Sequence, residues 1–502
     1  MAPHLLNVDV ATSRTDGNGS AHSSGQYRLT VLHPATTPGG RQQALIGDRG
    51  GALPISLAID TINKHFLYGL WGSRTGIIRE LEPGVLKRYN DSELRAEFSN
   101  IVLEVPVVDQ DGVTTYEYGP ALGWWMKHYK RRQYAEVVFD PVGTPLGNAY
   151  NLWRGLAVTP EVGVKRDLVR ACRRMLQHLR VIICAGDGAC FSYLLDWMGH
   201  LVQHPGVQMG VMPVLLSEAE GTGKSTIGFW LTKICGRHSQ VVSDAEQLVG
   251  KFNANLEQCI FVLANELSFA GDHKTARRLK AFITDPWLRI EPKGIEAYQV
   301  RNITNTMLTS NASWAVPAGT DARRFFVLDV STAKLGNTSY FDALYYEASH
   351  GGLEAFLAVL LSRDLSAFKP AAFPRTRALS RQQIKSLEPA AEWLMAVGQH
   401  EDGALGHPSG LTIDLPAQIT FQTLAESCAQ WSRSHNKHPP HEVELGGLLT
   451  KVVGARRRRA ATHIQRNSIG WGFINRPNAR CYSMPDGPTL LAALMAAKGV
   501  KL

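Results

Sequence analysis

The most informative part of this chain is residues 213–226, with the sequence Pro213-Val-Leu-Leu-Ser-Glu-Ala-Glu-Gly-Thr-Gly-Lys-Ser-Thr226. An apolar strand runs into a glycine-rich turn, which ends in a lysine and two hydroxyl residues. Glycines at 221 and 223 permit positive φ, so backbone N–H groups can surround a polyphosphate. Lys224 offers its charge to the outer phosphates, and Ser225 offers a hydroxyl to Mg²⁺. The sequence therefore predicts a site for ATP and Mg²⁺ formed by Gly221, Thr222, Gly223, Lys224, Ser225 and Thr226.

The residues on both sides of the turn support this interpretation. Residues 227–234 have apolar side chains at helical spacing, so the turn lies at a helix N-terminus, whose dipole favours anions. The complete phosphate-loop motif has glycine at position 218, where this chain has Glu218. A glycine-rich turn that binds no ligand is the alternative. The order strand, turn, Lys-Ser and helix favours phosphate binding.

Composition describes an ordinary globular protein. The chain has 502 residues, of which 44% are hydrophobic and 19% charged, enough for several domains with a sizeable core. A net charge of +9 suits a polyanionic partner. Seven scattered cysteines without a C-x-x-C pair indicate neither a disulfide framework nor a zinc site. Without an apolar run of about eighteen residues or a secretion signal, we expect no membrane contact and a cytoplasmic location.

Two further apolar segments end in polar side chains. The segment from Asn255 ends at Glu266, and the segment from Asn302 ends at Asn311. Ligands of parallel sheets lie beyond the carboxyl ends of the strands, so both side chains should lie beside the phosphates. Glu266 can polarise the attacking water or hold Mg²⁺ through water, and the Asn311 amide can orient that water. A strand ending in Asn-Glu by chance is the alternative for Glu266.

Cationic residues follow these segments. The predicted helix 273–283 carries Lys280, and the predicted strand and turn at 287–294 present Arg289 and Lys293. Arg323 and Arg324 then precede a further strand.

Taken together, the motifs resemble those of superfamily 3 helicases, above all the helicase portion of phage and plasmid primase-helicases. They are Gly-Thr-Gly-Lys-Ser (221–225), Leu-Ala-Asn-Glu (263–266), Lys-Gly (293–294), Leu-Thr-Ser-Asn (308–311) and Asp-Ala-Arg-Arg-Phe-Phe (321–326). Their order and spacing both match, and the similarity covers residues of about 130 to 370.

This resemblance implies an α/β fold with an AAA+-like P-loop ATPase core. It further implies a ring, commonly a hexamer, that moves single-stranded DNA 3′ to 5′ for a phage or mobile element. The implied catalytic residues are Lys224, Glu266, Asn311, Arg323 and Arg324, the arginines reaching a neighbour's ATP; Ser225 and Glu266 serve Mg²⁺, and Lys280, Arg289 and Lys293 meet DNA. The family usually has two adjacent acids on the second strand, whereas this chain has Asn265 before Glu266.

Pattern and composition divide the chain into segments. We expect a disordered tail (1–25), a small α+β module (26–140), a helical collar-like region (141–210), the ATPase core (211–362), a linker (363–400) and a basic, winged-helix-like domain (401–502). The last contains the run Arg456, Arg457, Arg458 and Arg459, interpreted as a nucleic-acid contact, with a solvated charged face as the alternative.

Aromatic and cationic residues alternate between Trp124 and Arg132. Such a mixture can stack on bases and hold phosphates. Amphipathic packing with solvated lysine and arginine is the interpretation that we favour for this segment.

The sequence leaves several functions open. The first is an ATP-dependent replicative DNA helicase whose partners are single-stranded and forked DNA, further copies of the chain and a candidate primase or polymerase. The second is an ATP-switched factor that binds and melts an origin without processive unwinding. The third is an AAA+ machine that acts on protein.

Overall fold

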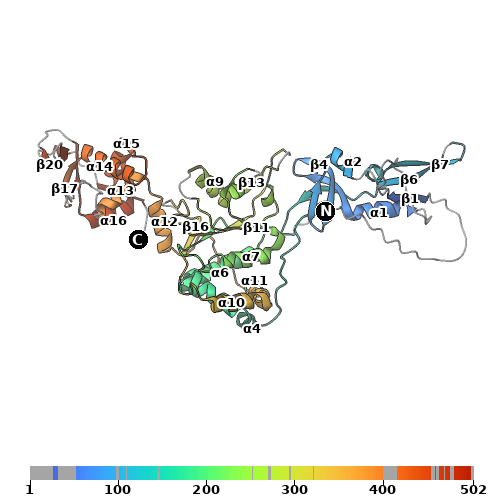
Figure 1. Ribbon diagram of the computed structural model, residues 1–502, viewed down its shortest axis with the longest axis horizontal. Coiled ribbons are helices and arrows are strands. Elements are labelled where there is room, and N and C mark those ends of the chain that lie inside the picture. Colours follow the sequence, from blue (N-terminus) through green and yellow to red (C-terminus); the bar gives the residue numbers. More distant parts are fainter. Residues whose placement is uncertain are drawn as a thin grey trace, which may run out of the picture. The chain divides into compact units, whose positions relative to one another are not determined.

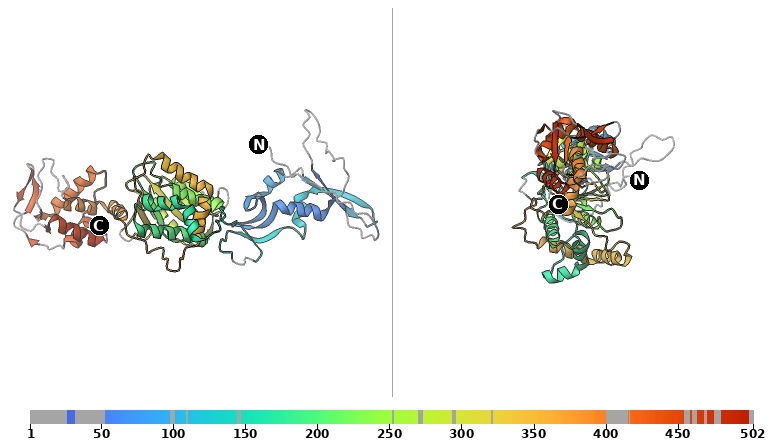
Figure 2. Two further views of the ribbon diagram at one scale, coloured as in Figure 1. Left: turned by 90° about the horizontal axis from the view of Figure 1, so that it is seen from below. Right: turned by 90° about the vertical axis from the view of Figure 1, so that its left-hand side faces the viewer.

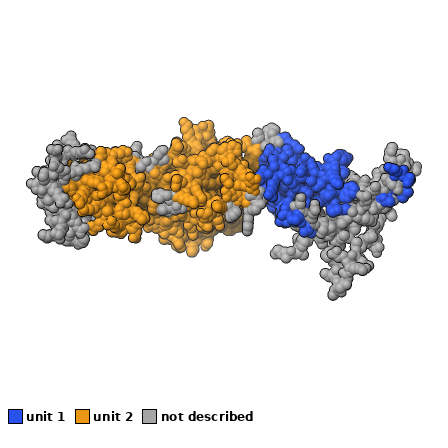
Figure 3. All heavy atoms as spheres, turned by 90° about the horizontal axis from the view of Figure 1, so that it is seen from above, with its two compact units in different colours: residues 1–138, 146–151 blue, residues 139–145, 152–502 orange. Residues whose placement is uncertain are grey.

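The structure is a computed structural model, and it describes residues 26–31, 53–97, 101–108, 110–143, 147–251, 253–269, 273–292, 296–319, 322–399, 415, 417–453, 458–459, 463–467, 470–474 and 480–498. The chain divides into two compact units (Figure 3). One contains residues 1–138 and 146–151, and the other contains residues 139–145 and 152–502.

A parallel sheet forms the centre of the second unit. Its strand order is β11-β12-β15-β10-β16. The residues of β10, β12 and β15 are all buried. Burial on both faces explains why β10 and β12 are continuous apolar runs, whereas β15 also buries the polar residues Asn305, Thr306, Thr309 and Ser310. The strands are β10 (Met212–Leu216), β11 (Ser239–Val242), β12 (Phe261–Ala264), β15 (Asn305–Ser310) and β16 (Phe325–Asp329).

The register of this sheet aligns the strand ends. Leu216 pairs with Ser310 on one side and with Asp329 on the other, while Ala264 pairs with Leu308. The glycine-rich turn and the ends of β12 and β15 therefore meet at one edge. Because Met212 pairs with Phe325, the residues before β16 lie at the opposite edge.

Helices cover both faces of the sheet (Figures 1 and 2). Helices α6 (Gly188–Gln203), α7 (Thr226–Cys235), α10 (Thr338–Glu347) and α11 (Leu353–Leu361) gather on one face, and α9 (His273–Thr284) lies on the other. The helices α4 (Lys165–Ala171), α5 (Arg173–Gln177) and α6 share one hydrophobic core with the sheet. From Leu168 onward, the helical region predicted at 141–210 packs into the same core as the sheet.

A two-stranded hairpin extends from α9. It consists of β13 (Trp287–Ile290) and β14 (Tyr298–Arg301), which pair antiparallel. The buried Asn253 fixes β13, because its Nδ2 donates to the Arg289 carbonyl at 2.9 Å and its Oδ1 accepts from the Glu291 N–H at 3.0 Å. The predicted strand is therefore present as β13, and residues 293–295 of the predicted turn lie outside the described residues.

The first unit has the predicted α+β composition. One sheet has the order β5-β4-β3-β8-β9, and another the order β2-β1-β6-β7. Helices α1 (Ile55–His65) and α3 (Ala121–Lys127) share a small core, in which Ile59 and Trp125 are buried together with Phe66 of β3. The strands are β1 (Gln26–Val31), β2 (Leu53–Pro54), β3 (Phe66–Trp71), β4 (Arg74–Glu82), β5 (Val85–Arg88), β6 (Ile101–Val108), β7 (Thr114–Pro120), β8 (Gln133–Val138) and β9 (Ala149–Asn151).

The C-terminal part differs from the expected linker. Residues within 363–400 form α12 (Arg377–Lys385), which packs on β16, and α13 (Pro389–Gly398), which joins the C-terminal core. Their apolar faces, including Leu379 and Trp393, are buried, so the segment is structured. That core also contains residues of α14 (Phe421–Ser434), α15 (Glu442–Val453), α16 (Gly487–Lys498), β17 (Ala417–Thr420) and β21 (Arg480–Met484). The last two strands belong to a sheet of order β18-β21-β17-β19-β20, whose other members are β18 (Arg458–Arg459), β19 (His463–Asn467) and β20 (Gly470–Ile474). A winged-helix-like identity stays a prediction.

Among the described residues, none of the helices combines the length and apolar character needed to span a membrane. Six cysteines are buried and have free thiols: Cys172, Cys184, Cys190, Cys235, Cys259 and Cys428. No cluster of metal-ligating side chains occurs in the described ranges.

Candidate nucleotide-binding site

The glycine-rich loop has the backbone that its sequence predicts. Gly221 has a φ of 72° and Gly223 a φ of 82°, a region that favours glycine. A Cβ at residue 223 would lie 2.7 Å from His178 Cε1, so glycine is also needed for space. Glu218 is exposed and its φ is not positive, so the loop does not need glycine at this position.

His178, which sequence reasoning missed, packs against this loop and contacts the Gly223 carbonyl. Its ring is fully buried, with Nε2 at 3.1 Å from the Gly223 carbonyl and Nδ1 at 3.1 Å from the Tyr340 hydroxyl. A ring protonated at Nε2 donates to the carbonyl and accepts from the hydroxyl. Burial lowers the pKa of His178 to about 4, so the ring is neutral at neutral pH. His178 lies 45 residues before Gly223 in the sequence and outside every motif, so the sequence carries no signal for its role.

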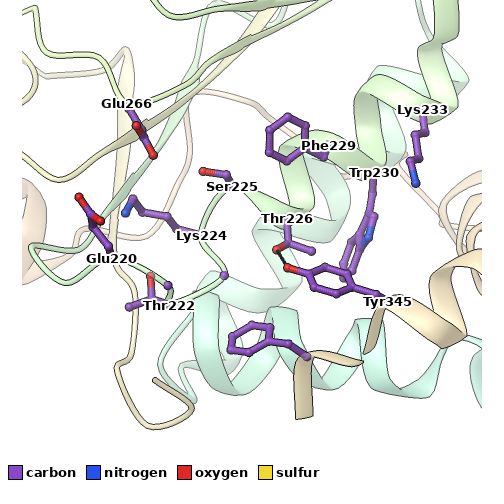
Figure 4. A pocket seen from close by; sticks show the side chains of 13 residues that line it. Glu220, Thr222, Lys224, Ser225, Thr226, Phe229, Trp230, Lys233, Glu266 and Tyr345 are labelled. Carbon is purple, nitrogen blue, oxygen red and sulfur yellow. Dashed lines mark hydrogen bonds between the residues drawn. The ribbon is translucent and has the colours of Figure 1, made fainter. Parts of the chain in front are cut away.

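Lys224 reaches the end of the neighbouring strand. Its side chain is 5% exposed, and Nζ donates a hydrogen bond to Asn311 Oδ1. Burial lowers the pKa of Lys224, while the nearby carboxylates of Glu266 and Glu220 act in the opposite direction (Figure 4). The site therefore holds a partly desolvated ammonium group that an anionic ligand would stabilise.

Thr309 joins the other polar strand ends. Its hydroxyl accepts from Ser225 Oγ at 3.3 Å and from the Glu266 N–H at 3.3 Å, and it donates to Asn265 Oδ1 at 3.0 Å. This bonding uses both acceptor sites and the single proton of the hydroxyl. Thr309 belongs to the motif Leu-Thr-Ser-Asn (308–311), but the sequence did not predict a role for it. Its position two residues before Asn311 was the available signal.

Glu266 adopts an unusual backbone conformation. Its φ is 59°, a left-handed value that costs a non-glycine residue about 1–2 kcal/mol. Its side chain is exposed and lines the cavity above the loop. Strain retained at a strand end beside a lysine is typical of a functional position.

A cavity of about 560 Å³ lies over the loop (Figure 4). Its polar side chains come from the loop, α7 and the end of β12, and its aromatic side chains from α7 and α10. The buried Thr222 hydroxyl has no hydrogen-bond partner among the described residues. Sequence reasoning did not predict the aromatic wall of the cavity, formed by Phe229, Trp230, Phe341 and Tyr345. The lining residues are Glu220, Gly221, Thr222, Gly223, Lys224, Ser225, Thr226, Phe229, Trp230, Lys233, Glu266, Phe341 and Tyr345.

The arginine pair lies far from this cavity within the same chain. Arg323 is exposed, and the buried Nε of Arg324 has no hydrogen-bond partner in the described part of the chain. Both precede β16 and therefore lie at the opposite edge from the loop, about 17 Å away along a five-residue strand. Lys280 lies near Arg324. Burial, and then the charge of Arg324, lower the pKa of Lys280.

The remaining residues predicted to contact DNA fall into two groups. Arg289 lies on β13, exposed, with its Nε at 3.0 Å from a carboxylate oxygen of Glu291. Lys293, Arg456 and Arg457 lie outside the described residues, and Arg458 and Arg459 form β18. The structure thus brings Lys224, Glu266 and Asn311 together, whereas Lys280 lies beside Arg324 before β16.

Residues 215–324 match a family of unknown function, DUF5906. The range begins inside β10 and ends at Arg324, so it contains the loop and both polar strand ends. The DNA primase-polymerase of Nitratiruptor phage NrS-1 is 28% identical over 177 residues. This match covers 34% of the chain and 24% of the phage protein, so the compared segment is a minor part of that relative.

Solved structures of the NrS-1 C-terminal region have a similar fold. One apo structure superposes with a TM-score of 0.55 at 17% identity, covering 86% of this chain and 99% of the other. Its A form gives a TM-score of 0.54 over 85% of this chain and 99% of the other. The JCV helicase reaches 0.24, a level from which no common fold follows. The chain is therefore a mixed α/β protein similar in fold to the NrS-1 C-terminal region.

Proposed function

We propose that this chain is an ATP-dependent DNA helicase that acts in replication of a phage or mobile element. The observation that carries the proposal is the convergence of Lys224, Glu266 and Asn311 beside a glycine-rich loop at one edge of a parallel sheet. The similarity to a phage DNA primase-polymerase supports a role in DNA replication in the cytoplasm of a bacterial host. The motif order of superfamily 3 helicases supports unwinding, with an AAA+-like core.

The residues of the cavity match the chemistry of a nucleoside triphosphate. The unpartnered Thr222 hydroxyl and the desolvated Lys224 ammonium can bind phosphate oxygens. Asn311 holds the lysine before the ligand arrives, and it can then turn its amide toward the attacking water. Aromatic rings at the other end of the cavity, Phe229 and Tyr345 among them, can cover a base.

Hydrolysis in this proposal depends on Glu266. Its carboxylate extends from a strained strand end into the cavity, where it can accept a proton from water. When bound, Mg²⁺ supplies charge neutralisation between the phosphates. Ser225 would hold the metal, with Thr309 and Asn265 orienting the Ser225 hydroxyl. The neutral Asn265 takes the position where the resembled family has an acid.

A second copy of the chain completes the site. Arg323 and Arg324 lie at the sheet edge opposite their own loop, so they can serve only a neighbour's nucleotide. In a ring, each arginine pair would neutralise the transition state at the adjacent subunit. Lys280, Arg289, Lys293 and the run 456–459 would bind the DNA backbone, and a primase or polymerase remains a candidate partner.

A strand-displacement assay tests this function. Forked duplexes with either a 3′ or a 5′ single-stranded tail are incubated with the full chain and ATP. The proposal predicts displacement of the 3′-tailed substrate and its loss in Lys224→Ala. ATP-dependent melting of one preferred duplex, without displacement of tailed substrates, would favour an origin-melting factor instead. ATP hydrolysis that ignores DNA would overturn the helicase assignment.

A further inference from the structure

The loop between α3 and β8 presents an aromatic ring to solvent. Tyr129 is 85% exposed, so its ring contributes little to the core of the first unit. One face of the ring is stacked on His128, with centroids 4.8 Å apart and planes 27° apart. The exposure of the tyrosine leaves its ring accessible to a planar ligand, with the ammonium group of the exposed Lys130 side chain 5.8 Å over the ring centre.

The backbone of this loop is fixed. Asn63 Nδ2 donates to the Lys130 carbonyl at 2.9 Å. Asn63 Oδ1 accepts from the Trp125 indole at 2.7 Å and from the Arg132 N–H at 2.8 Å. The Trp125 ring is itself fully buried. Tyr129 therefore sits on a loop that is anchored on both sides, which lowers the entropy lost when a ligand binds.

The basic residues around Tyr129 divide into two groups. Arg131 and Arg132 are engaged inside the unit, since Arg131 Nη1 donates to the Met126 carbonyl at 2.6 Å and Arg132 Nη1 lies 2.7 Å from Glu80. Lys127 and Lys130 are exposed, and neither is in an ion pair with the described residues. The Lys130 ammonium lies 5.8 Å from the Tyr129 ring centre.

We propose that Lys127, Tyr129 and Lys130 form a binding site for single-stranded DNA. An accessible aromatic ring stacks on any unpaired base, and flanking ammonium groups hold the adjacent phosphates. A duplex does not fit this chemistry, because its base faces are already stacked on one another. The amphipathic packing expected for segment 124–132 thus holds for Trp125, Arg131 and Arg132, whereas the outward residues form a separate site.

This inference rests on the proposed function in one respect, which is that the nucleic acid bound at this site is DNA. It is therefore tested without ATP and in the Lys224→Ala background, where motor activity plays no part. A failure of the motor would leave this result intact, and a failure of this site would leave ATP hydrolysis intact.

The experiment measures binding of a fluorescein-labelled thymidine oligomer to the full chain by anisotropy. Tyr129→Ala should weaken binding about five-fold to hundred-fold, and Tyr129→Phe should bind as the parent does. The double variant Lys127→Ala, Lys130→Ala should reduce the slope of log K against log salt by about 1.4. A blunt duplex of equal length should bind equally to parent and Tyr129→Ala.

Tyr346→Ala is the matched control. Tyr346 is 65% exposed and is stacked on His350, but its sequence neighbour is Glu347 rather than a lysine. Its loss should leave affinity unchanged, and all variants should melt at the parent temperature. Equal affinity of parent and Tyr129→Ala for the oligomer would overturn the site. Poly-glutamate binding that depends equally on Tyr129 would also overturn it, in favour of an acidic peptide.

Discussion

Lys224 shows how single residues prepare the cavity. Its ammonium group is almost fully buried, with one amide oxygen as a hydrogen-bond partner and two carboxylates near it. Burying a charge without full compensation is costly, and the cost is recovered when an anion binds.

Glu266→Gln should separate binding from hydrolysis. The amide keeps the size of the side chain but cannot accept a proton, so kcat for ATP should fall about 10²- to 10⁴-fold while the Kd for ATP changes little. Steady-state hydrolysis and calorimetric binding measure the two quantities. Glu220→Gln is the control, because Glu220 also lines the cavity near Lys224 but does not end a strand. Similar losses in both variants would speak against Glu266 as the base.

His178→Phe should weaken nucleotide binding. Phenylalanine fills the same buried space but removes the hydrogen bonds to the Gly223 carbonyl and the Tyr340 hydroxyl. Loss of such buried bonds costs about 1–3 kcal/mol, so the Kd for ATP should rise about ten-fold. Tyr340→Phe, which removes only the outer bond, should have a smaller effect. ATP affinity that is unchanged in His178→Phe would contradict this role.

The buried histidines predict an acid-sensitive fold. Burial lowers the pKa of His178 and His238 from 6.5 to about 4. The unfolded chain therefore binds more protons between pH 6.5 and 4, and stability falls as pH falls through this window, by at most about 1.4 kcal/mol per pH unit for each ring. Denaturant unfolding between pH 7 and pH 4.5 measures this slope. His238→Gln should make it shallower, and an equal slope would refute the assignment.

At the scale of elements, the sheet edge organises the site. Its polar groups come from separate segments of the chain, and strand register together with the path of the loop brings Thr309 beside Ser225 and Glu266. The sequence predicted which strands end in polar residues, because buried parallel strands are short apolar runs bounded by such residues. It could not predict Thr309 as the bridging group, since hydrogen bonds between strands depend on register.

The aromatic wall illustrates a second limit. Phe229 follows the loop closely in sequence, but Tyr345 lies 119 residues after Thr226, with the hydroxyl oxygens of Thr226 and Tyr345 3.4 Å apart. Periodicity assigns an aromatic residue to a helix face and does not state what that face covers. The packing of α10 against the loop was therefore not predictable from the sequence.

The β13–β14 hairpin should depend on Asn253. Asn253→Ala removes the side chain that bonds the Arg289 carbonyl and the Glu291 N–H, so the hairpin should open more often. Hydrogen exchange should accelerate in residues 287–291, and strand displacement should slow while the Kd for ATP is unchanged. Asn255→Ala is the control, since Asn255 is exposed on the same segment. Protection of the hairpin in Asn253→Ala equal to that of the parent would exclude this role.

At the scale of the whole molecule, the central question is whether one chain suffices. The loop and the arginine pair lie at opposite ends of the strands of one sheet, so in our proposal a complete site requires two copies. The family resemblance assigns the arginines to a neighbour's nucleotide, and their distance from their own loop is consistent with that assignment.

Mixing two inactive variants tests this most directly. Lys224→Ala lacks the phosphate contact, and Arg323→Ala, Arg324→Ala lacks the neighbour's arginines, so each alone should hydrolyse almost no ATP. In a ring assembled from equal amounts of both, about a quarter of the sites join an intact loop to an intact arginine pair. The account predicts that ATP hydrolysis returns to about that fraction of the parent rate. Mixtures that stay inactive, or a double-arginine variant that is active alone, would contradict it.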